Sequence, residues 1–306
     1  MTKNLLFLFL LASVLNAAVF LFRDSFQYQP TATYAELYGE CNANCLASWK
    51  GAAARYSQSD LEAGRRILDT VVRKNSQTAK AKVFDIASFL YTRFHSQAGT
   101  PNDYIKTALP LDQYKQLSKD KSLQLWCGNF GTMLFFFCWA ENIPCRAIEI
   151  INKGQHHIVN EFYDEESGSW IFADAMNNLF LLKNDQGKYL NLVDFIDAVN
   201  RTAGKIGQGL AQQLKGLEIN PTYYSSQSEL YYYHDFDKDK VYSFRAKLRR
   251  YFLPVSWYEI YGQQQGSPVL FYGKLLLLLC WIVLVLVMVT RRVRRIVSHN
   301  KTSLSQ

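Results

Sequence analysis

The chain has 306 residues, of which 49% are hydrophobic, and it contains only 7 prolines and 16 glycines. This composition suits one well-buried globular domain with additions, and it excludes a disordered or fibrous protein. The formal net charge is +8, but much of the basic charge lies near the two ends. The terminal basic residues are Lys3, Arg291, Arg292, Arg294, Arg295 and Lys301. Because the middle of the chain is nearly neutral, a nucleic-acid partner is not expected.

Residues 5–22 form an apolar stretch that follows Lys3. Such a stretch is typical of a signal peptide or a signal anchor, here over residues 1–23. Cleavage after Ala17 or Ala18 would place a large or polar residue three positions before the cut, where signal peptidase prefers a small one. We therefore favour an uncleaved anchor.

Residues 24–120 are predicted to be a helical N-terminal part. Ser59 and Glu62 have the spacing of a capping box, which predicts the start of an amphipathic helix. Two further helices are predicted, with a loop rich in turn-forming residues between them. They are Ala79–Phe94 and Leu109–Leu117, and the loop is residues 99–103.

Residues 127–142 are apolar on nearly all sides, which is typical of a central helix packed on several faces. The run is short for a membrane span and has Asn129 and Thr132 near its start, so a buried core helix is predicted. Beyond it, turn-forming residues divide the chain into an antiparallel meander. The three predicted strands are Ala147–Ile151, His157–Tyr163 and Ser169–Asp174. Helices followed by strands indicate an α+β fold.

Residues 190–215 again favour helix, and the Tyr-rich juxtamembrane region at 216–267 is left without an assigned fold. The apolar run from Leu275 to Val289 reaches the length of a bilayer crossing when its apolar flanks are included. Because arginines follow it directly, the positive-inside bias predicts a transmembrane helix at 268–290 and a basic cytoplasmic tail at 291–306. The region between the two apolar segments is then predicted to face the periplasm or the cell exterior, attached to the cytoplasmic (inner) membrane.

Four short elements stand out, in a fixed order, between residues 121 and 215. They are Cys127, then Ile143-Pro144-Cys145-Arg146, then His157-Ile158-Val159-Asn160-Glu161-Phe162-Tyr163, then Trp170-Ile171-Phe172-Ala173-Asp174. This order resembles the transglutaminase-like superfamily, which has a Cys at a helix start, a Gly-Ile-Pro-Ala-Arg-like element, a His-x-Trp-x-Glu-x-Tyr strand and a Trp-x-x-x-Asp strand. The resemblance implies a papain-like catalytic core over 121–215, with Cys127, His157 and Asp174 as its triad.

The chain departs from the family pattern at three positions. Asn142 stands where the family has Gly, Cys145 where it has Ala, and Val159 where it has Trp. None of them is a triad position. They bear on the subfamily more than on the superfamily.

The residue chemistry agrees with a thiol enzyme. A thiol becomes a nucleophile only as thiolate, which a helix N-terminus and an imidazolium stabilise, so Cys127 at the mouth of the central helix is well placed. His157 and Asp174 fall on neighbouring strands of one hairpin and are predicted to be nearly opposite each other if the turn is centred near Glu166. Asp174 can then orient His157. His156 is the alternative base, but strand alternation points it away from Asp174.

Other residues near the triad are given supporting roles. The Cys127 backbone N–H is expected to stabilise an oxyanion together with one further donor, for which Gln124 and Trp126 are both candidates. Glu161 lies on the strand face of the predicted base and is expected either to support it or to serve packing. Arg146 is expected to tie the end of the central helix to the sheet.

No metal or cofactor is predicted. Residues 235–239 begin like a calcium loop, but Lys240 and Ala246 stand where such a loop needs a glycine and an acid. This segment is therefore interpreted as a solvated turn.

Cysteines outside a reducing cytoplasm can form disulfides. Cys41 and Cys45 are one candidate pair, and Cys138 and Cys145 are another. Cys280 lies in the predicted transmembrane helix.

The predicted function is acyl transfer. The thiolate attacks an amide or ester carbonyl of a peptide, protein or envelope substrate, and water or an amine resolves the thioester. Peptidase, amidase and transglutaminase-like transferase all stay open. The alternative is a catalytically inactive transglutaminase-like scaffold of the cell envelope that uses its cleft to bind a peptide or a glycan.

Overall fold

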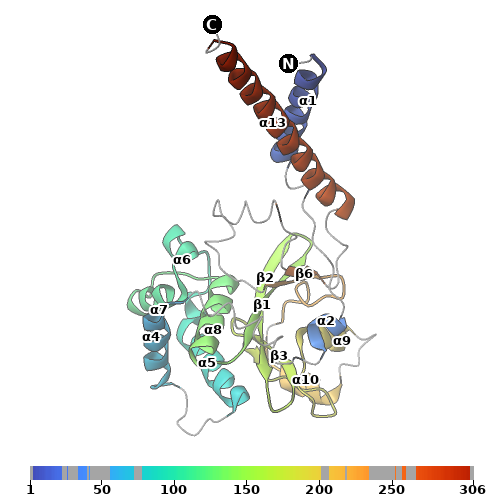
Figure 1. The fold of residues 1–306 in the computed structure, drawn as a ribbon. Coiled ribbons are helices and arrows are strands. Elements are labelled where there is room, and N and C mark those ends of the chain that lie inside the picture. The colour runs from blue at the N-terminus through green and yellow to red at the C-terminus, as the bar shows by residue number, and fades with distance from the viewer. Residues whose placement is uncertain are drawn as a thin grey trace. The chain divides into compact units, whose positions relative to one another are not determined.

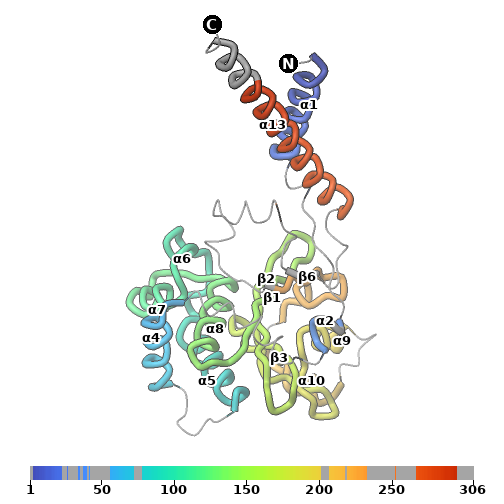
Figure 2. The backbone as a smooth tube through the Cα atoms, viewed as in Figure 1, coloured from blue at the N-terminus to red at the C-terminus, as the bar shows by residue number. Residues whose placement is uncertain are grey.

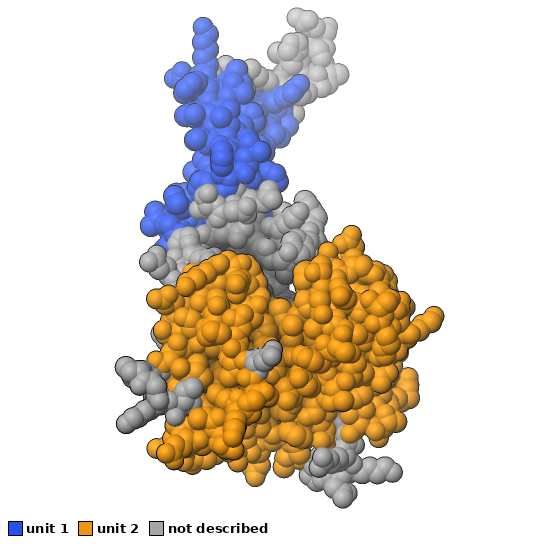
Figure 3. Space-filling model, turned by 180° about the vertical axis from the view of Figure 1, so that it is seen from behind, with its two compact units in different colours: residues 1–30, 243–255, 264–306 blue, residues 31–242, 256–263 orange. Residues whose placement is uncertain are grey.

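The fold is known from a computed structural model, shown as a ribbon in Figure 1 and as a tube in Figure 2. The structure describes residues 3–22, 26, 34–39, 41, 56–71, 78–200, 207–217, 219–233, 252, 257–259 and 267–303. The chain divides into two compact units, coloured blue and orange in Figure 3. Unit 1 comprises residues 1–30, 243–255 and 264–306, and unit 2 comprises residues 31–242 and 256–263.

Unit 1 contains two long apolar helices, α1 (Lys3–Leu21) and α13 (Pro268–Ser303). Both contain a segment long and apolar enough to cross a membrane, at Lys3–Leu21 and Pro268–Arg294, and most of their large apolar side chains are exposed. The helices are therefore compatible with membrane anchoring. Helix α13 continues well beyond the predicted span, since part of the predicted cytoplasmic tail is helical.

Unit 2 is an α+β structure built on one antiparallel sheet with the strand order β4-β3-β2-β1-β5-β6. The strands are β1 (Cys145–Asn152), β2 (Gln155–Asp164), β3 (Ser169–Asp174), β4 (Leu179–Phe180), β5 (Glu229–Tyr233) and β6 (Trp257–Glu259). The meander predicted between residues 147 and 174 is confirmed as β1, β2 and β3. Strands β5 and β6 come from the Tyr-rich region and extend the sheet beyond β1.

Helices cover both faces of this sheet (Figure 1). One face carries α4 (Gln58–Leu68), α5 (Ala79–Phe94), α6 (Asp103–Thr107), α7 (Pro110–Lys119) and α8 (Cys127–Ala140). The other carries α2 (Tyr34–Tyr38), α9 (Leu192–Asn200) and α10 (Gln208–Leu214). Successive residues of a strand point to opposite faces, so Phe162 joins the first core and Tyr163 the second.

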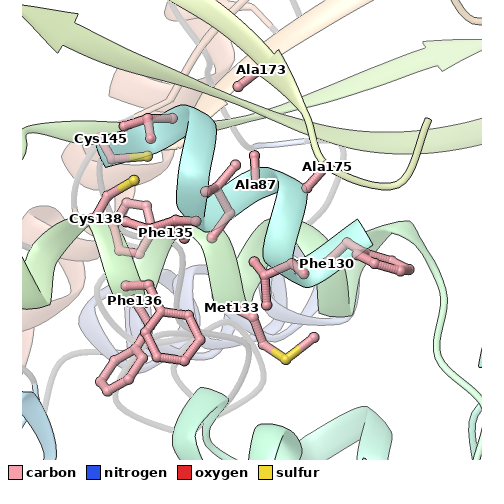
Figure 4. Close-up of a cluster of buried hydrophobic side chains, with 14 of the residues drawn as sticks. Ala87, Phe130, Met133, Phe135, Phe136, Cys138, Cys145, Ala173 and Ala175 are labelled. Carbon is pink, nitrogen blue, oxygen red and sulfur yellow. The ribbon is translucent and has the colours of Figure 1, made fainter. Parts of the chain in front are cut away.

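Helix α8 is the central helix of the first layer and contacts α4, α5, α7, β1 and β2. Its side chains are buried on every side, and Figure 4 shows Phe135, Phe136 and Cys138 packed in this core. The prediction of a buried core helix is confirmed.

The end of α8 gives a physical reason for Asn142. Asn142 has φ 58°, its N–H binds the Trp139 carbonyl, and the Ile143 N–H binds the Cys138 carbonyl. This is a Schellman motif with Asn142 at the left-handed position, where Gly or Asn is favoured. The helix therefore ends at Ala140 rather than at residue 142.

The other helix predictions are largely right, with one correction. The cap of α4 is Ser57 and not Ser59, because Ser57 has an extended backbone and its Oγ accepts the Asp60 N–H at 3.1 Å. Helix α5 has the predicted bounds, and α7 lies within two residues of its prediction. The short helices α6 and η3 (His95–Gln97) were not predicted.

The cysteine predictions have different outcomes. Cys41 is in a disulfide, and Cys45 lies outside the described residues. Cys138 and Cys145 are free thiols, so the second predicted disulfide is wrong. Both lie in the apolar core, where burial raises the pKa of the Cys145 thiol well above its usual range and keeps it protonated. The calcium-like segment at 235–239 also lies outside the described residues.

Candidate active site

The thiol of Cys127 lies at the first residue of α8. Buried Asn129 fixes this helix start, because its Oδ1 accepts the Trp126 N–H at 3.2 Å and its Nδ2 donates to the Ile105 carbonyl at 3.0 Å. Gly131 then allows the helix to approach β2 closely. A Cβ at that position would lie 2.7 Å from Cγ2 of Ile158. This close approach brings the half-buried Cys127 to the strand that carries His157, and its Sγ lies 4.0 Å from the His156 carbonyl oxygen.

His157 and Asp174 form a buried pair. The His157 Nε2 lies 2.7 Å from Asp174 Oδ2, and each side chain is 1% exposed. Because Nε2 faces the carboxylate, Nδ1 is the ring nitrogen left for the Cys127 thiol, and this thiol is one of the groups that raise the pKa of His157. The structure thus places the imidazole between the thiol and the carboxylate.

Asp174 reaches His157 diagonally across the sheet. The β2–β3 ladder runs from Asp164↔Ser169 to Asn160↔Ala173, so His157 lies beyond its last pair and Asp174 is two residues short of a directly opposed position. Diagonal neighbours on one face remain within reach of long side chains. The prediction of nearly opposed residues is therefore off by two residues, while the predicted pairing of the side chains is present.

Other donors surround the Asp174 carboxylate. The N–H groups of Met176 and Asn177 bind Oδ1 at 3.0 and 3.2 Å. The Asn177 Nδ2 and the Tyr224 hydroxyl donate to Oδ2 at 2.7 and 2.5 Å. Burial would raise the pKa of Asp174, but His157 and these donors lower it below its usual value. The carboxylate therefore stays ionised at neutral pH.

The charge of His157 follows from the same contacts. Burial alone would lower its pKa, but Asp174 and, to a smaller extent, Cys127 raise it from 6.5 to about 10. The imidazole is therefore cationic at neutral pH. A cationic imidazole beside a thiol is the environment that stabilises a thiolate.

Two tyrosines complete the site, and sequence reasoning missed both. Tyr223 stacks on the His157 ring, with 4.5 Å between centroids and 12° between planes. Tyr224 meets the same ring edge-on at 6.1 Å. They belong to the Tyr-rich region that was left unassigned, where two adjacent tyrosines after Asn220-Pro221 were the available signal.

The two oxyanion candidates differ in their surroundings. Gln124 is exposed, and its carboxamide packs over Gly99, where a Cβ would lie 2.7 Å from the amide carbon. The backbone N–H of Trp126 is engaged by Asn129, and its indole, 40% exposed, lies 5.9 Å from the Lys106 ammonium. The Cys127 N–H belongs to the first turn of α8, where backbone N–H groups carry partial positive charge.

Arg146 and Glu161 form a separate buried ion pair. Arg146 Nε and Nη2 lie 2.9 and 2.6 Å from Glu161 Oε2, and Nη1 donates to the Leu37 carbonyl. The Tyr38 hydroxyl and the Leu192 N–H bind the other Glu161 oxygen at 2.8 and 2.7 Å. The pair therefore holds α2 and the start of α9 against the sheet.

His156 points to the other side of the strand. Its side chain is 58% exposed, and its Nδ1 lies 2.8 Å from Glu149 Oε1. Strand alternation thus separates it from Asp174, as predicted. Among the residues that the structure describes, no three His, Cys, Asp or Glu side chains gather as a metal site.

Comparison with known proteins adds two distant structural likenesses. No family model and no curated protein matches the sequence. A candidate cysteine protease from Cytophaga hutchinsonii superposes with a TM-score of 0.33 and 20% identity, over 45% of this chain and 44% of its own. LapG of Legionella pneumophila, treated with EGTA, superposes with a TM-score of 0.28 and 18% identity, over 44% of this chain and 73% of its own. The chemistry of the site therefore rests on its own geometry.

Proposed function

We propose that the chain is a membrane-anchored, transglutaminase-like thiol enzyme that transfers acyl groups through Cys127, His157 and Asp174. The observation that carries this proposal is the buried imidazole, which is hydrogen-bonded to the Asp174 carboxylate and lies on the strand that the Cys127 thiol contacts from a helix start. The order of sequence motifs around these three residues is the order found in the transglutaminase-like superfamily. Two independent features, the motif order and the side-chain geometry, thus select the same residues.

The first half of the reaction forms a thioester. The Cys127 thiolate attacks an amide or ester carbonyl, and the oxyanion is stabilised by the Cys127 N–H at the start of α8. His157 then gives its Nδ1 proton to the leaving amine or alcohol as the carbon–heteroatom bond breaks. Asp174 holds the imidazole in position throughout.

The second half resolves the thioester. Neutral His157 takes a proton from water or from an amine, which attacks the thioester carbonyl. The carbon–sulfur bond breaks, and the Cys127 thiolate beside the imidazolium is restored. If water attacks the thioester, the protein acts as a peptidase or amidase. If an amine attacks it, the protein acts as a transferase.

The substrate class follows from the proposed topology. The arginines that follow the apolar part of α13, and Lys3 at the start of α1, favour a unit 2 outside the cytoplasmic membrane, in the periplasm or at the cell exterior. The substrate is then a peptide, a protein or an envelope component with an accessible amide or ester. Membrane attachment restricts the enzyme to substrates near that surface.

The test measures how fast iodoacetamide labels Cys127 in the full chain in detergent, by peptide mass spectrometry, from about pH 5 to 9. Cys127 should label first, and its rate should stay high at acidic pH, because His157 holds the thiolate. His157→Ala should lower the rate at about pH 6 by at least tenfold. His156→Ala, which changes the exposed neighbour, is the matched control and should have little effect. Equal rates in wild type and His157→Ala would falsify the catalytic proposal and leave the binding scaffold in its place.

A further inference from the structure

The segment 219–225 supplies two consecutive side chains that contact His157 and Asp174. Tyr223 stacks on the imidazole of His157, and Tyr224 donates to the carboxylate of Asp174. Both members of the His157–Asp174 pair are thus held by one short segment that is distant from them in the chain.

The backbone of this segment is held by side chains from three different places. The carbonyl of Thr222 accepts from Asn152 Nδ2 at 2.7 Å, that of Tyr223 from Ser228 Oγ at 2.7 Å, and that of Tyr224 from Asn200 Nδ2 at 2.6 Å. Asn152 ends β1, Asn200 ends α9, and Ser228 directly precedes β5. Three successive carbonyls with separate side-chain donors give an irregular segment a defined conformation. The two tyrosine side chains are therefore preorganised.

Tyr224 fixes the carboxylate. Its ring is buried against Phe172 and Phe195, at 5.9 and 5.1 Å between centroids. Burial and the nearby Asp174 charge raise the pKa of the Tyr224 hydroxyl well above its usual range, so the hydroxyl is a donor at any pH at which the site works. Its bond to Oδ2 lies beside that of His157 and fixes the direction of that oxygen.

Tyr223 fixes the imidazole plane. One face of its ring lies on His157, and the side chain as a whole is half-buried. Burial and the Cys127 charge raise the pKa of its hydroxyl. Stacking restricts rotation of the imidazole and covers that face of it from water.

We infer that Tyr223 and Tyr224 are positioning residues of the acyl-transfer site. Tyr224 aligns the Asp174 carboxylate, and Tyr223 holds the His157 ring in the plane that joins this carboxylate to the Cys127 thiol. The inference rests on the proposed function and adds a segment from outside the family motifs to the site. A preorganised base is effective because its supporting groups leave it few other orientations.

The experiment compares Tyr223→Leu, Tyr223→Phe and Tyr224→Phe in the full chain in detergent. The readouts are the pH profile of iodoacetamide labelling at Cys127 and the imidazole ¹⁵N shifts of His157, which report its protonation and tautomer. Tyr223→Leu should lower the labelling rate at about pH 6 by roughly tenfold, because the imidazole is no longer held in plane. Tyr223→Phe keeps the stacked ring and should stay within about twofold of wild type.

Tyr224→Phe keeps the buried ring and removes only the bond to Asp174. The pKa of Asp174 should then rise, so the acid limb of the labelling profile should move to higher pH. Tyr189→Leu is the control for loss of a tyrosine elsewhere, since that ring lies beneath Lys80 at the far end of β2. Thermal unfolding of each variant shows that it is folded.

The outcomes separate this inference from the proposed function. If Cys127 is reactive in wild type and the Tyr223→Leu and Tyr224→Phe variants have unchanged profiles and unchanged His157 shifts, the positioning role is wrong and the triad stands. If Cys127 is unreactive in wild type, the proposed function is wrong, and the positioning role that rests on it is wrong as well. The positioning role is supported if Cys127 is reactive in wild type, Tyr223→Leu lowers its labelling rate, and Tyr223→Phe keeps the rate near that of wild type.

Discussion

Asp174 shows how a buried charge is kept in this site. Two backbone N–H groups bind one of its oxygens, and His157, Asn177 and Tyr224 surround the other. A carboxylate removed from water is costly unless such donors replace its hydration. The donors therefore let Asp174 remain an anion beside the imidazole, which is what the orienting role proposed for it requires.

The raised pKa of His157 makes the stability of unit 2 depend on pH. A histidine with a pKa of 6.5 when unfolded and about 10 when folded stabilises the fold fully below pH 6.5, and this contribution is lost as the pH rises through about 10. We expect His157→Gln to lower the free energy of unfolding by about 3–5 kcal/mol near pH 6, since it leaves Asp174 without its charged partner. The difference from wild type should shrink toward pH 10. Denaturant titration followed by tryptophan fluorescence measures both values.

His156→Gln is the control for this comparison, because the side chain of His156 is largely exposed. It should change stability little at any pH. A His157→Gln effect that stays constant between neutral pH and about pH 10 would contradict the cationic imidazole.

The sequence predicted that His157 and Asp174 pair because they are only 17 positions apart on one hairpin, and a hairpin is recognisable from local alternation and turn residues. Tyr224 contacts Asp174 across 50 positions. That contact depends on where the segment after α10 folds back onto the sheet, and no periodic pattern in the sequence predicts this position. The two-residue offset of Asp174 was missed for a related reason, because the register depends on the exact turn, where Ser167 binds the Asp164 carboxylate.

Helix α8 is buried along its whole length, from the candidate site residue at its start to the turn at its end. Its start presents Cys127, and its end turns through the Schellman motif at Asn142 into β1. The apolar pattern predicted this helix well, because nearly every one of its side chains is buried. The same pattern contains no signal for β5 and β6, which are rich in aromatic residues and lie in a long Tyr-rich region.

Asn142 allows a test of how α8 ends. Asn142→Gly should be neutral or slightly stabilising, because glycine adopts φ near 58° without strain. Asn142→Val should cost about 1–2 kcal/mol, because a β-branched side chain is disfavoured in the left-handed region. Denaturant titration of the two variants beside wild type measures the difference. Equal stability of the valine and glycine variants would mean that the turn does not need this conformation.

The ion pair of Arg146 and Glu161 connects elements rather than reacting groups. The guanidinium lies over the rings of Trp170, Tyr38 and Tyr232 at 4.0, 4.8 and 4.8 Å, and the pair binds the backbone of α2 and α9. Sequence reasoning expected Arg146 to connect the helix end to the sheet. The structure corrects this, because the contacts of Arg146 lie on the face of the sheet opposite to α8, where they fix the short helix α2.

The two apolar helices of unit 1 contact each other near the middle of each. Trp281 Nε1 donates to Ser13 Oγ at 2.8 Å, and the Trp281 ring lies 6.1 Å from that of Phe9. Ser13 is near the centre of the span Lys3–Leu21, and Trp281 is at the centre of the span Pro268–Arg294. Two helices that share a bilayer place their centres at the same depth, and a hydrogen bond between them is stabilising there.

The basic residues beside the two spans lead to a prediction of topology for the whole chain. Lys3 lies at the start of the first span and four arginines directly follow the apolar run Leu275–Val289 of the second, so both termini are expected in the cytoplasm and residues from about 25 to 265 outside it. Alkaline phosphatase fused after Gln265 should be active, and the same reporter fused after Gln306 should be inactive. Intact-mass measurement should find residues 1–22 present in the mature protein, since α1 packs against α13. An inactive fusion at Gln265 beside an active cytoplasmic reporter at the same position would reverse the topology, and with it the extracytoplasmic substrate proposed for Cys127.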